Sequence, residues 1–437
     1  MTSQSDPWAL GVSRREFLKG SAAVSAAAAL AGLAPGGVFA AGSDRIRVGL
    51  VGCGGRGNGA LGNCLEAAKI VGHPVQVWAV GDLFEDRAST TFNGLKARAQ
   101  KEPETFAITQ ERVFTGFDNY QKVLASGVDL VLLATPPGFR AVQFPAVIKA
   151  GKHVFMEKPV CVDPWGYHQV CQAADEAKEK KLTVVAGTQR RHETARRENL
   201  KRIHDGAIGD LVAGQCYWLG GPVTHNRPRA PGQSDIEWQI RNWYAWCWTC
   251  GDHIVEQHVH NIDMICWAFA AHPKSAKAVG GRQARPEPGN IYDHFAVEFE
   301  FPSGARVASY CSHFRGASGR VGENVVGTKG SSALAGGIEG ADPWRYSGPG
   351  ANAMVQEHVD CLNSLLGKGE YWNEGRQVAE SSMAAVLGRM SAYTGAQISW
   401  DWAMTSKLRL GKEGWDWHSF GDFTPPPVAV PGVTKLV

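Results

Sequence analysis

The sequence has 437 residues and a formal net charge of +3, with 45 Lys and Arg residues against 42 Asp and Glu residues. A charge this close to neutral argues against nucleic acid or an anionic membrane surface as a partner. The length suggests two domains, each large enough for a hydrophobic core of its own.

The first residues of the chain have the pattern of a twin-arginine export signal. Arg14 and Arg15 precede an Ala-rich apolar segment at residues 20–33. Such a signal is an address that a receptor reads, and this segment is shorter than the roughly 20 residues that span a bilayer. Val38 and Ala40 suit signal peptidase and predict cleavage after Ala40. The alternative is a chance Arg-Arg pair at the start of an amphipathic helix.

We therefore expect residues 1–40 to be a signal peptide and the mature protein to be periplasmic or otherwise extracytoplasmic, without stable membrane association. The chain has 10 Cys residues, which in an exported protein suggests disulfides. Twin-arginine substrates fold before export in a reducing compartment, so cysteines that act as small hydrophobes are the alternative. Cys247 and Cys250 have redox or metal-site spacing, but no second pair completes a zinc site.

A glycine-rich turn follows the first apolar run of the mature chain, residues 46–51. Three glycines in this turn permit a sharp bend, close approach of the backbone to a pyrophosphate, and close packing of the next helix. The segment 58–69 has helical character, so free N–H groups at its start would face the phosphates. The predicted phosphate contacts are Gly52, Gly54, Gly55, Arg56 and Gly57.

The second apolar run, residues 75–80, is followed by Gly81 and Asp82. A carboxylate at the end of this strand would accept hydrogen bonds from the ribose hydroxyls of a dinucleotide. It would also repel a 2′-phosphate, which favours NAD, while Arg56 and Arg87 keep NADP possible. The sequence thus predicts an NAD(P)-binding Rossmann domain over residues 43–165.

A further strand, residues 128–134, stops at Thr135 and Pro136, and a helical segment leads to a strand that ends in Glu157-Lys158-Pro159. Strand, helix and strand at this spacing form a parallel crossover unit. Ligands of open α/β folds bind at the carboxyl edge of the sheet, where Lys158 would lie. The alternative for a lone lysine is a solvated surface position.

Together, the glycine-rich turn, the Thr135-Pro136 strand end and Glu157-Lys158-Pro159 make the chain similar to the Gfo/Idh/MocA family, which includes glucose–fructose oxidoreductase. The resemblance covers essentially the whole mature chain. It implies an α/β Rossmann domain with a doubly wound parallel sheet, then an α+β domain with a large, mostly antiparallel open sheet. It also implies that Thr135, Pro136 and Glu157 contact the cofactor, and that Lys158 lies against the nicotinamide and the reacting hydroxyl.

The resemblance assigns residues 166–400 to a substrate-binding domain. Residues 184–191 resemble the family's next strand, whose end approaches nicotinamide and substrate, so Gln189 is a predicted cofactor contact and Arg191 a predicted substrate contact. Apolar and polar residues alternate farther along, as in antiparallel strands. These predicted strands are residues 212–218, 293–301 and 305–311.

The densest group of chemically active side chains follows a Trp-rich segment. As one helix, this stretch places Glu256, His260 and Asp263 on a shared face, which His253 joins from the preceding turn. The family motif Asp-x-Gly-x-His-x-x-Asp maps onto Glu256, His258, His260 and Asp263. Glu256 stands for an aspartate, and His258 stands for a small residue, which would alter the pocket floor.

The resemblance makes His260 the acid/base that exchanges a proton with the substrate hydroxyl, aided by Lys158 and Glu256. The near-neutral pKa of free histidine suits this task. Metal ligation and structural hydrogen bonding are the alternatives, but no metal is expected because a helical His-x-His splays its rings by roughly 200°. Upstream aromatic residues could stack on a sugar, wall the pocket or form an interface. The predicted substrate contacts are Arg191, Trp243, Tyr244, His253, Gln257 and His260.

Toward the C-terminus, a helix at about residues 374–394 is predicted to pack back on the Rossmann domain. Residues 401–437 are predicted to be a C-terminal arm, whose Pro-rich part from Thr424 to Val437 is extended and could lie on a neighbouring subunit. In relatives, the outer face of the second sheet forms the oligomer contact, which implies a homodimer or homotetramer.

The resemblance implies an exported oxidoreductase that moves hydride between a carbohydrate or polyol carbon and a nicotinamide cofactor, NAD or NADP. Because free nicotinamide cofactors belong to the cytosol, export predicts a tightly bound cofactor. Two alternatives remain open. One is a glycosidase that oxidises its sugar transiently with bound NAD, and the other is a non-catalytic carbohydrate-binding protein.

Overall fold

The structure is a computed structural model that describes residues 44–223, 227–414 and 423–435. The predicted export signal and its cleavage site lie outside the described residues. Within the described part of the chain, no helix combines the length and the apolar character that crossing a membrane requires.

The first sheet contains six parallel strands in the order β3-β2-β1-β4-β5-β6. Its strands are β1 (Ile46–Val51), β2 (Val75–Asp82), β3 (Val113–Thr115), β4 (Leu130–Leu133), β5 (His153–Met156) and β6 (Val184–Ala186). Its helices are α2 (Gly55–Val71), α3 (Glu85–Ala99), α4 (Asn119–Ala125), α5 (Arg140–Lys149) and α6 (Pro164–Glu179). The central strands are buried apolar runs, as expected for a parallel sheet covered on both faces.

The second sheet contains nine strands in the order β14-β13-β12-β11-β7-β10-β9-β8-β15. Its strands are β7 (Leu211–Gly220), β8 (Ser275–Gly281), β9 (His294–Glu300), β10 (Arg306–His313), β11 (Arg320–Gly327), β12 (Gly330–Ser332), β13 (Gly337–Gly340), β14 (Trp344–Arg345) and β15 (Ile398–Ser399). The pair β7–β10 is parallel and the other neighbouring strands are antiparallel. The predicted fold class and the three predicted strands of this half are thereby confirmed.

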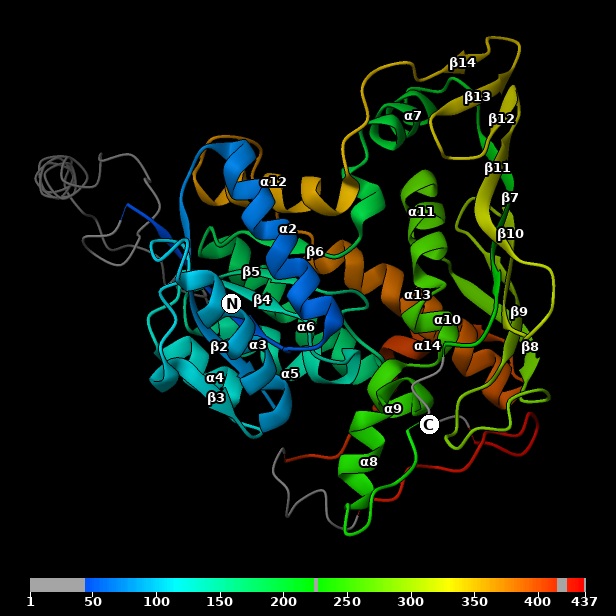
Figure 1. Ribbon diagram of the computed structural model, residues 1–437. Helices are drawn as coiled ribbons and strands as arrows, with labels where there is room; N and C mark the ends of the chain where they lie inside the picture. Colours follow the sequence, from blue (N-terminus) through cyan, green and yellow to red (C-terminus); the bar gives the residue numbers. More distant parts are fainter. Residues whose placement is uncertain (1–43, 224–226, 415–422, 436–437) are drawn as a thin grey trace, which may run out of the picture. The chain divides into compact units, whose positions relative to one another are not determined.

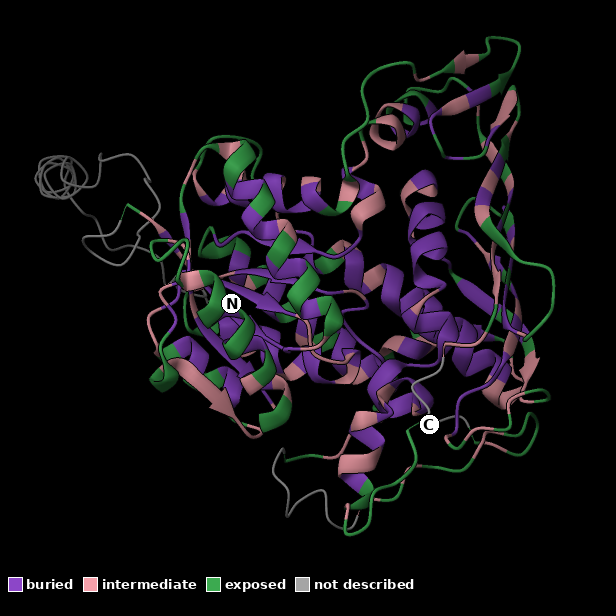
Figure 2. Cartoon of the chain, in the orientation of Figure 1, coloured by how far each residue is buried: buried purple, intermediate pink, exposed green. Residues whose placement is uncertain are grey.

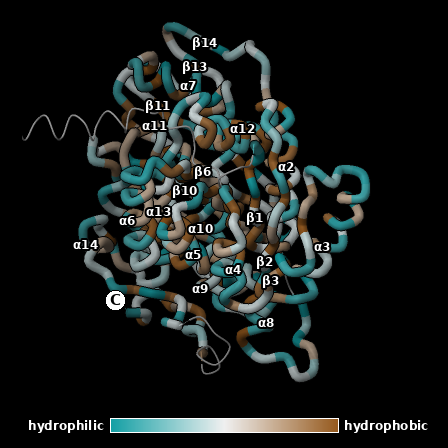
Figure 3. The backbone as a smooth tube through the Cα atoms, turned by 90° about the vertical axis from the view of Figure 1, so that its left-hand side faces the viewer, coloured by the Kyte–Doolittle hydropathy of each residue, from teal (hydrophilic) through white to brown (hydrophobic). Residues whose placement is uncertain are grey.

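The remaining helices surround the second sheet or join the two sheets. They are α7 (Thr194–His204), α8 (Asp235–Arg241), α9 (Cys247–Cys250), α10 (His253–Glu256), α11 (Val259–Phe269), α12 (Ala353–Leu365), α13 (Gly375–Thr394) and α14 (Trp400–Thr405). Short 3-10 helices are η1 (Gln110–Arg112), η2 (Pro137–Phe139), η3 (Gln189–His192) and η4 (Trp243–Ala245). Figure 3 shows the hydrophilic character of α3 and the loop after it, which border the first sheet.

Strand β6 and helix α12 belong to the first half of the molecule, although the predicted domain boundaries place them in the second. Strand β6 pairs with β5 and completes the Rossmann sheet, so the first domain extends beyond residue 165. Helix α12 packs on α2 although it follows strand β14 of the second sheet in the chain. The chain thus returns from the second sheet to the first half of the molecule, and no local pattern in the sequence indicates this return.

Helix α13 joins the two halves of the molecule. It packs on α6 of the first half and on β8 and β9 of the second sheet, so it lies between them (Figure 1). Most of its residues are buried, as Figure 2 shows. A helix that is apolar or small on nearly every side suits such a sandwiched position.

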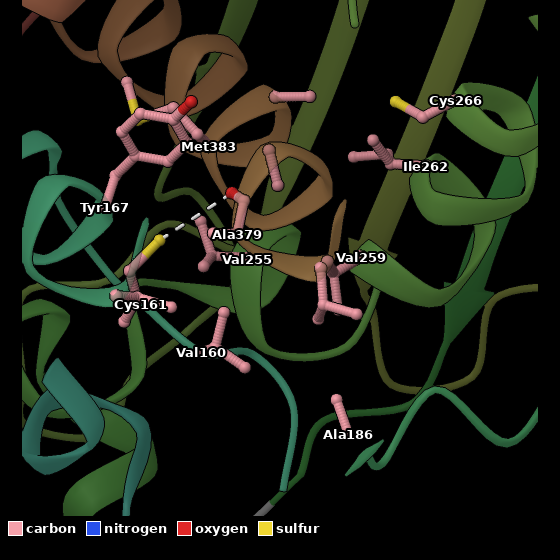
Figure 4. Close-up of a cluster of buried hydrophobic side chains, with 14 of the residues drawn as sticks. Val160, Cys161, Tyr167, Ala186, Val255, Val259, Ile262, Cys266, Ala379 and Met383 are labelled. Carbon is pink, nitrogen blue, oxygen red and sulfur yellow. Dashed lines mark hydrogen bonds between the residues drawn. The ribbon is translucent and has the colours of Figure 1, made fainter. Parts of the chain in front are cut away.

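The core around α13 ties together two segments that carry predicted catalytic residues (Figure 4). Val160 and Cys161 follow the Glu157-Lys158-Pro159 segment, and Val255 precedes Glu256; all three belong to one buried cluster with Ala379 of α13. Close packing makes such a core resistant to deformation. Lys158 and Glu256 are therefore held in fixed positions relative to each other, although Lys158 follows strand β5 of the first sheet and Glu256 ends helix α10.

The C-terminal arm begins with α14. Its described last part lies on the same chain, because Asn290 Nδ2 donates to the carbonyl of Pro426 at 2.9 Å and Tyr292 Oη donates to that of Ala429 at 2.8 Å. Residues 415–422 of the predicted arm lie outside the described residues.

Candidate active site

A cavity of about 700 Å³ opens at the carboxyl ends of the parallel strands, and both halves of the chain line it. This is the edge at which open α/β sheets bind ligands. The site residues predicted from the sequence that line this cavity are Gly52, Gly54, Gly55, Arg56, Gly57, Asp82, Thr135, Pro136, Glu157, Lys158, Gln189, Trp243, Glu256, Gln257 and His260.

The glycine-rich turn has the geometry of a dinucleotide-binding site. Gly52 has φ 101°, and a Cβ at Gly57 would lie 1.8 Å from the carbonyl oxygen of Gly52. Both positions therefore require glycine. Helix α2 starts after Gly54 without a side-chain cap, so its first N–H groups are available to an anion at the cavity.

Asp82 lies at the end of β2 beside this turn. Its Oδ2 accepts a hydrogen bond from the backbone N–H of Cys53 at 2.7 Å, and its Oδ1 accepts one from that of Phe84 at 2.9 Å. The carboxylate thus fixes the ends of β1 and β2 while one edge lines the cavity. Each oxygen retains a lone pair that a ribose hydroxyl could use.

Arg56 connects three elements at the floor of the cavity. Its Nε donates to Glu157 Oε1, and its Nη2 lies 3.3 Å from Glu357 Oε1 on α12. Burial, reinforced by the charge of Glu157, raises the pKa of Glu357 well above its usual range. The partnership with Glu357 depends on the return of α12, which the sequence patterns did not reveal.

Lys158 and Glu256 form an ion pair across the two halves. Lys158 Nζ lies 3.0 Å from Glu256 Oε1 and also donates to the backbone carbonyl of Glu256. Each side chain is only 10% exposed. This pair places a cation and a carboxylate together at the wall of the cavity, where charge is screened less than in water.

His260 lines the cavity near that pair. Burial, with the positive charges of Lys158 and Arg190, holds the pKa of His260 well below its usual range. The imidazole is therefore neutral at pH 7, which is the form that accepts a proton, and the same burial and positive charges make it a weaker base than a free histidine. Its ring stacks on that of Trp218, with centroids 5.9 Å apart and planes 28° apart.

Trp218 also lines the cavity, and sequence reasoning did not assign it a role. Within β7, Gly214, Cys216 and Trp218 occupy alternate positions, so they point to the same side of the sheet. Gly214 and Cys216 are buried. This alternation was the available signal that Trp218 faces inward.

The stretch predicted as one helix is divided in two. α10 ends at Glu256 and α11 begins at Val259. The break turns Gln257 toward the cavity, while His258 Nε2 lies 2.8 Å from Ser309 Oγ of the second sheet. His258 therefore does not form the cavity floor, because it hydrogen-bonds inside the second half.

Arg191 does not line the cavity, contrary to its prediction as a substrate contact. Its Nε and Nη2 donate to both oxygens of Asp263 at 2.8–3.1 Å, and Ser381 Oγ donates to the same carboxylate at 2.7 Å. Arg191 and Asp263 are buried. A local motif could not reveal this pairing, because Asp263 belongs to a distant helix.

Arg191→Ala is expected to destabilise the protein by about 3–5 kcal/mol, because it leaves the buried Asp263 carboxylate without its partner. Urea unfolding followed by circular dichroism measures this effect. Asp263→Asn in the same chain should recover part of the loss, since it removes the unpaired charge. Unchanged stability with lost activity would instead restore the substrate-contact assignment.

Tyr244 and His253 also lie outside the cavity lining. They are 2% and 0% exposed, and Tyr244 Oη lies 3.4 Å from His253 Nδ1. The ring of His253 packs on His313 with centroids 3.5 Å apart. These predicted substrate contacts are therefore buried outside the cavity lining.

Acidification is expected to destabilise the protein. Burial lowers the pKa to about 4 for His153 and His313 and to about 3 for His258 and His358. The unfolded chain binds protons at these histidines near pH 6.5, so the stability that they contribute is lost as pH falls from about 6.5 to about 4. In the described residues, four carboxylates with a raised pKa, among them Asp252 at about 6, oppose this trend, but seven histidines with a lowered pKa outnumber them.

The expected slope is roughly 1.4 kcal/mol for each pH unit and each net proton. Urea unfolding at pH 7, 6 and 5 measures it. The variant His258→Gln should reduce the slope, because it removes one of the titrating groups. A free energy of unfolding that rises on acidification would contradict the account.

Within the described residues, no group of three or more His, Cys, Asp or Glu side chains is arranged to hold a metal ion. Cys247 and Cys250 are buried thiols without a disulfide. Burial raises the pKa of Cys247 to about 11, which disfavours the thiolate that metal binding and redox exchange require.

Comparison with known families agrees with the geometry of the site. Residues 46–186 match the "Oxidoreductase family, NAD-binding Rossmann fold", and residues 197–333 match the "GFO/IDH/MocA C-terminal domain". Residues 11–31 match the "TAT (twin-arginine translocation) pathway signal sequence". This match to twin-arginine signal sequences supports the predicted export signal.

Individual relatives are distant. The chain is 26% identical to inositol 2-dehydrogenase 3 of Saccharopolyspora erythraea over 265 residues, which are 60% of this chain and 65% of that protein. It is 28% identical to a glycosyl hydrolase family 109 protein of Streptomyces coelicolor over 184 residues, which are 42% of this chain and 36% of that protein. The chain thus spans no more than 65% of the length of these relatives.

The fold is shared with solved structures. The aldose-aldose oxidoreductase from Caulobacter crescentus complexed with glycerol superposes with a TM-score of 0.61 and 15% identity, over 81% of this chain and 99% of that chain. The two family matches together cover more than half of the present sequence. The chain belongs to the Gfo/Idh/MocA family of oxidoreductases.

Proposed function

We propose that the protein is an exported oxidoreductase that transfers hydride between a hydroxyl-bearing carbon of a carbohydrate or polyol and a tightly bound nicotinamide cofactor. The observation that carries this proposal is the layout of the cavity. One end has a glycine-rich turn at a helix N-terminus, and another region has the Lys158–Glu256 pair and the neutral His260. The inositol dehydrogenase relative supports the substrate class.

The residues of the chain divide the work of this reaction. A bound nicotinamide supplies the hydride chemistry. The turn at Gly52 and Gly57 and the start of α2 hold its phosphates, and Asp82 holds its ribose. His260 accepts the hydroxyl proton with its neutral imidazole, while Lys158, oriented by Glu256, stabilises the negative charge that develops on the oxygen.

Asp82 favours NAD as this cofactor. Its carboxylate lines the cavity at the end of β2 and is fixed by two backbone N–H groups. A 2′-phosphate at this edge would meet the carboxylate, whereas two ribose hydroxyls would donate to it. Arg87 lines the same end and is the group that would favour NADP instead.

The export signal gives the reason for tight binding. A cofactor that is scarce outside the cytoplasm must be loaded before export, and it must be reset afterwards by a second substrate. The solved relative described as an aldose-aldose oxidoreductase supports such a closed cycle. The site of action proposed here is the periplasm or another extracytoplasmic space.

The proposal is tested by adding a panel of sugars and polyols to the purified mature protein, without added cofactor, and recording the absorbance of reduced nicotinamide. One substrate should reduce the bound cofactor in a single turnover, and a second, oxidised sugar should restore it. The product is identified by mass as the sugar that has lost two hydrogens. A protein that carries the cofactor but responds to no member of the panel would contradict the hydride-transfer proposal.

A glycosidase with transient oxidation is the second candidate, and the glycosyl hydrolase family 109 relative supports it. Hydride leaves the sugar and returns to it within one turnover in such a mechanism. The same panel, extended to glycosides, distinguishes the two. Release of free sugar with no net change in the absorbance of reduced nicotinamide favours the glycosidase.

The outer face of the second sheet is the proposed contact between subunits. Val279, Tyr310 and Tyr217 lie in register on that face, and Val279 is 67% and Tyr310 40% exposed. Exposed apolar residues in a row across a sheet are typical of an interface. The double variant Val279→Lys, Tyr310→Lys should therefore be a monomer by light scattering, whereas Ile70→Lys on exposed α2 should keep the mass of the parent. An unchanged mass in the double variant would exclude this face.

A further inference from the structure

Arg140, the first residue of α5, has no exposed surface and lies in the lining of the cavity. Its Nε donates to the carbonyl of Glu157 at 2.9 Å, and its Nη2 donates to the carbonyl of Thr135 at 2.9 Å. Its Nη1 donates to the carbonyl of Leu133 at 3.1 Å and to Thr135 Oγ1 at 3.2 Å. One guanidinium thus binds the ends of two neighbouring strands.

Each of those strand ends leads into the cavity. β4 ends at Leu133 and continues to Thr135, and β5 ends at Met156 and continues to Glu157 and Lys158. Thr135, Glu157 and Lys158 all line the cavity. The hydrogen bonds of Arg140 therefore join the two loops that carry the cavity-lining residues at this edge.

The burial of Arg140 has a large energetic cost. A guanidinium removed from water must have its donors satisfied, and here the acceptors are three carbonyls and a hydroxyl. The neighbouring Glu157 carboxylate is engaged by Arg56 instead. Burial lowers the pKa of Arg140 to about 10, so it remains charged at neutral pH. A buried cation held chiefly by backbone carbonyls suggests that the geometry it imposes is needed.

The shape of the side chain explains why arginine occupies this position. The planar guanidinium offers five donors in a rigid fork, so it can serve carbonyls on two strands at once. A lysine has a single nitrogen on a flexible stem and would not reproduce the spacing. Lysine at position 140 would therefore keep the charge and lose the link between the strands.

We infer that Arg140 is a positioning residue, which sets the spacing of the Thr135 and Glu157–Lys158 loops and thereby the affinity of the site for its nicotinamide cofactor. This inference rests on the proposed function, because the cofactor is the group that the two loops would hold. Arg140 acts through these loops and not by proton transfer.

Arg389 on α13 provides a matched control. It is also buried, at 1% exposed, and its Nη1 donates to the carbonyls of Val162 at 2.7 Å and Gly251 at 2.9 Å. It does not line the cavity. Arg389→Lys therefore disturbs a buried arginine of the same kind without touching the strand ends at the site.

The test removes the bound cofactor and then measures the Kd for NAD by equilibrium dialysis and the melting temperature, on the full mature chain and on Arg140→Lys and Arg389→Lys. Arg140→Lys should raise the Kd about tenfold or more, since misplacement of a site by a fraction of an ångström has effects of this size. Arg389→Lys should lower the melting temperature similarly and leave the Kd within about twofold of the parent value. Arg140→Gln, which buries no charge, serves if Arg140→Lys does not fold, and the same rise in Kd is expected.

An unchanged Kd in the folded Arg140 variants would overturn the inference, as would an equal rise in Arg389→Lys. Failure of the proposed function has a different signature: the parent protein would bind no NAD, or it would bind NAD and exchange hydride with no sugar or polyol of the panel. In the second case Arg140→Lys would still raise the Kd.

Discussion

Lys158→Met is expected to lower kcat/KM by a factor of about 10²–10³, the usual contribution of a group that stabilises the negative charge developing on the reacting oxygen. Lys158 Nζ lies 3.0 Å from Glu256 Oε1 at the cavity wall. The variant removes the cation that would face the reacting oxygen and leaves the Glu256 carboxylate without its ion-pair partner. The measurement is steady-state kinetics with the sugar or polyol that the screen identifies.

Lys122→Met is the control for this variant. Lys122 pairs with Asp118 at 2.9 Å on α4, and both side chains are about half exposed. Such a surface pair contributes little to stability, so this variant should retain the kcat/KM of the parent. A folded Lys158→Met protein with parental kcat/KM would remove Lys158 from the proposed mechanism and would favour a non-catalytic role.

Gly57→Ala is expected to abolish cofactor binding, with the Kd for NAD raised at least about 100-fold, because no shift of a flexible side chain can relieve the contact. The added Cβ would lie 1.8 Å from the carbonyl oxygen of Gly52. The turn must open to admit it, which moves the start of α2 away from its place beside β1. Equilibrium dialysis with NAD measures the loss.

Gly62→Ala tests the same substitution on the same helix. A Cβ at Gly62 would meet none of the described atoms within 4 Å, and alanine is favoured over glycine in a helix by about 1 kcal/mol. This variant should bind NAD normally and melt at the parental temperature or above. Loss of NAD binding in Gly62→Ala as well would mean that α2 tolerates no substitution, and the turn geometry would not be the cause.

The parts of the site that could be predicted from the sequence are those whose function depends on local backbone geometry. A glycine-rich turn between a strand and a helix has one conformation, so Gly52 and Gly57 could be assigned from their spacing. Lys158 could be assigned because it follows a buried strand, and parallel strands bring their carboxyl ends to one edge. The Rossmann domain followed from this strand and turn pattern, whereas the architecture of the second domain came from the family resemblance.

The parts that could not be predicted depend on contacts between distant segments. Arg191 has the same local context as Gln189, but its partner Asp263 lies on α11 and draws it away from the cavity. Glu357 reaches Arg56 only because α12 returns to the first half of the chain. Helix α10 ends at Glu256 and α11 begins at Val259. The helical periodicity of the sequence continues across this break, so the sequence alone did not predict it.

The central claim is that the exported protein carries its own nicotinamide cofactor. The most direct measurement is to purify the mature protein after export through its own signal, denature it, and identify small molecules in the supernatant by mass. The account predicts NAD in an amount close to one molecule for each protein chain. A supernatant that contains no NAD or NADP would contradict it.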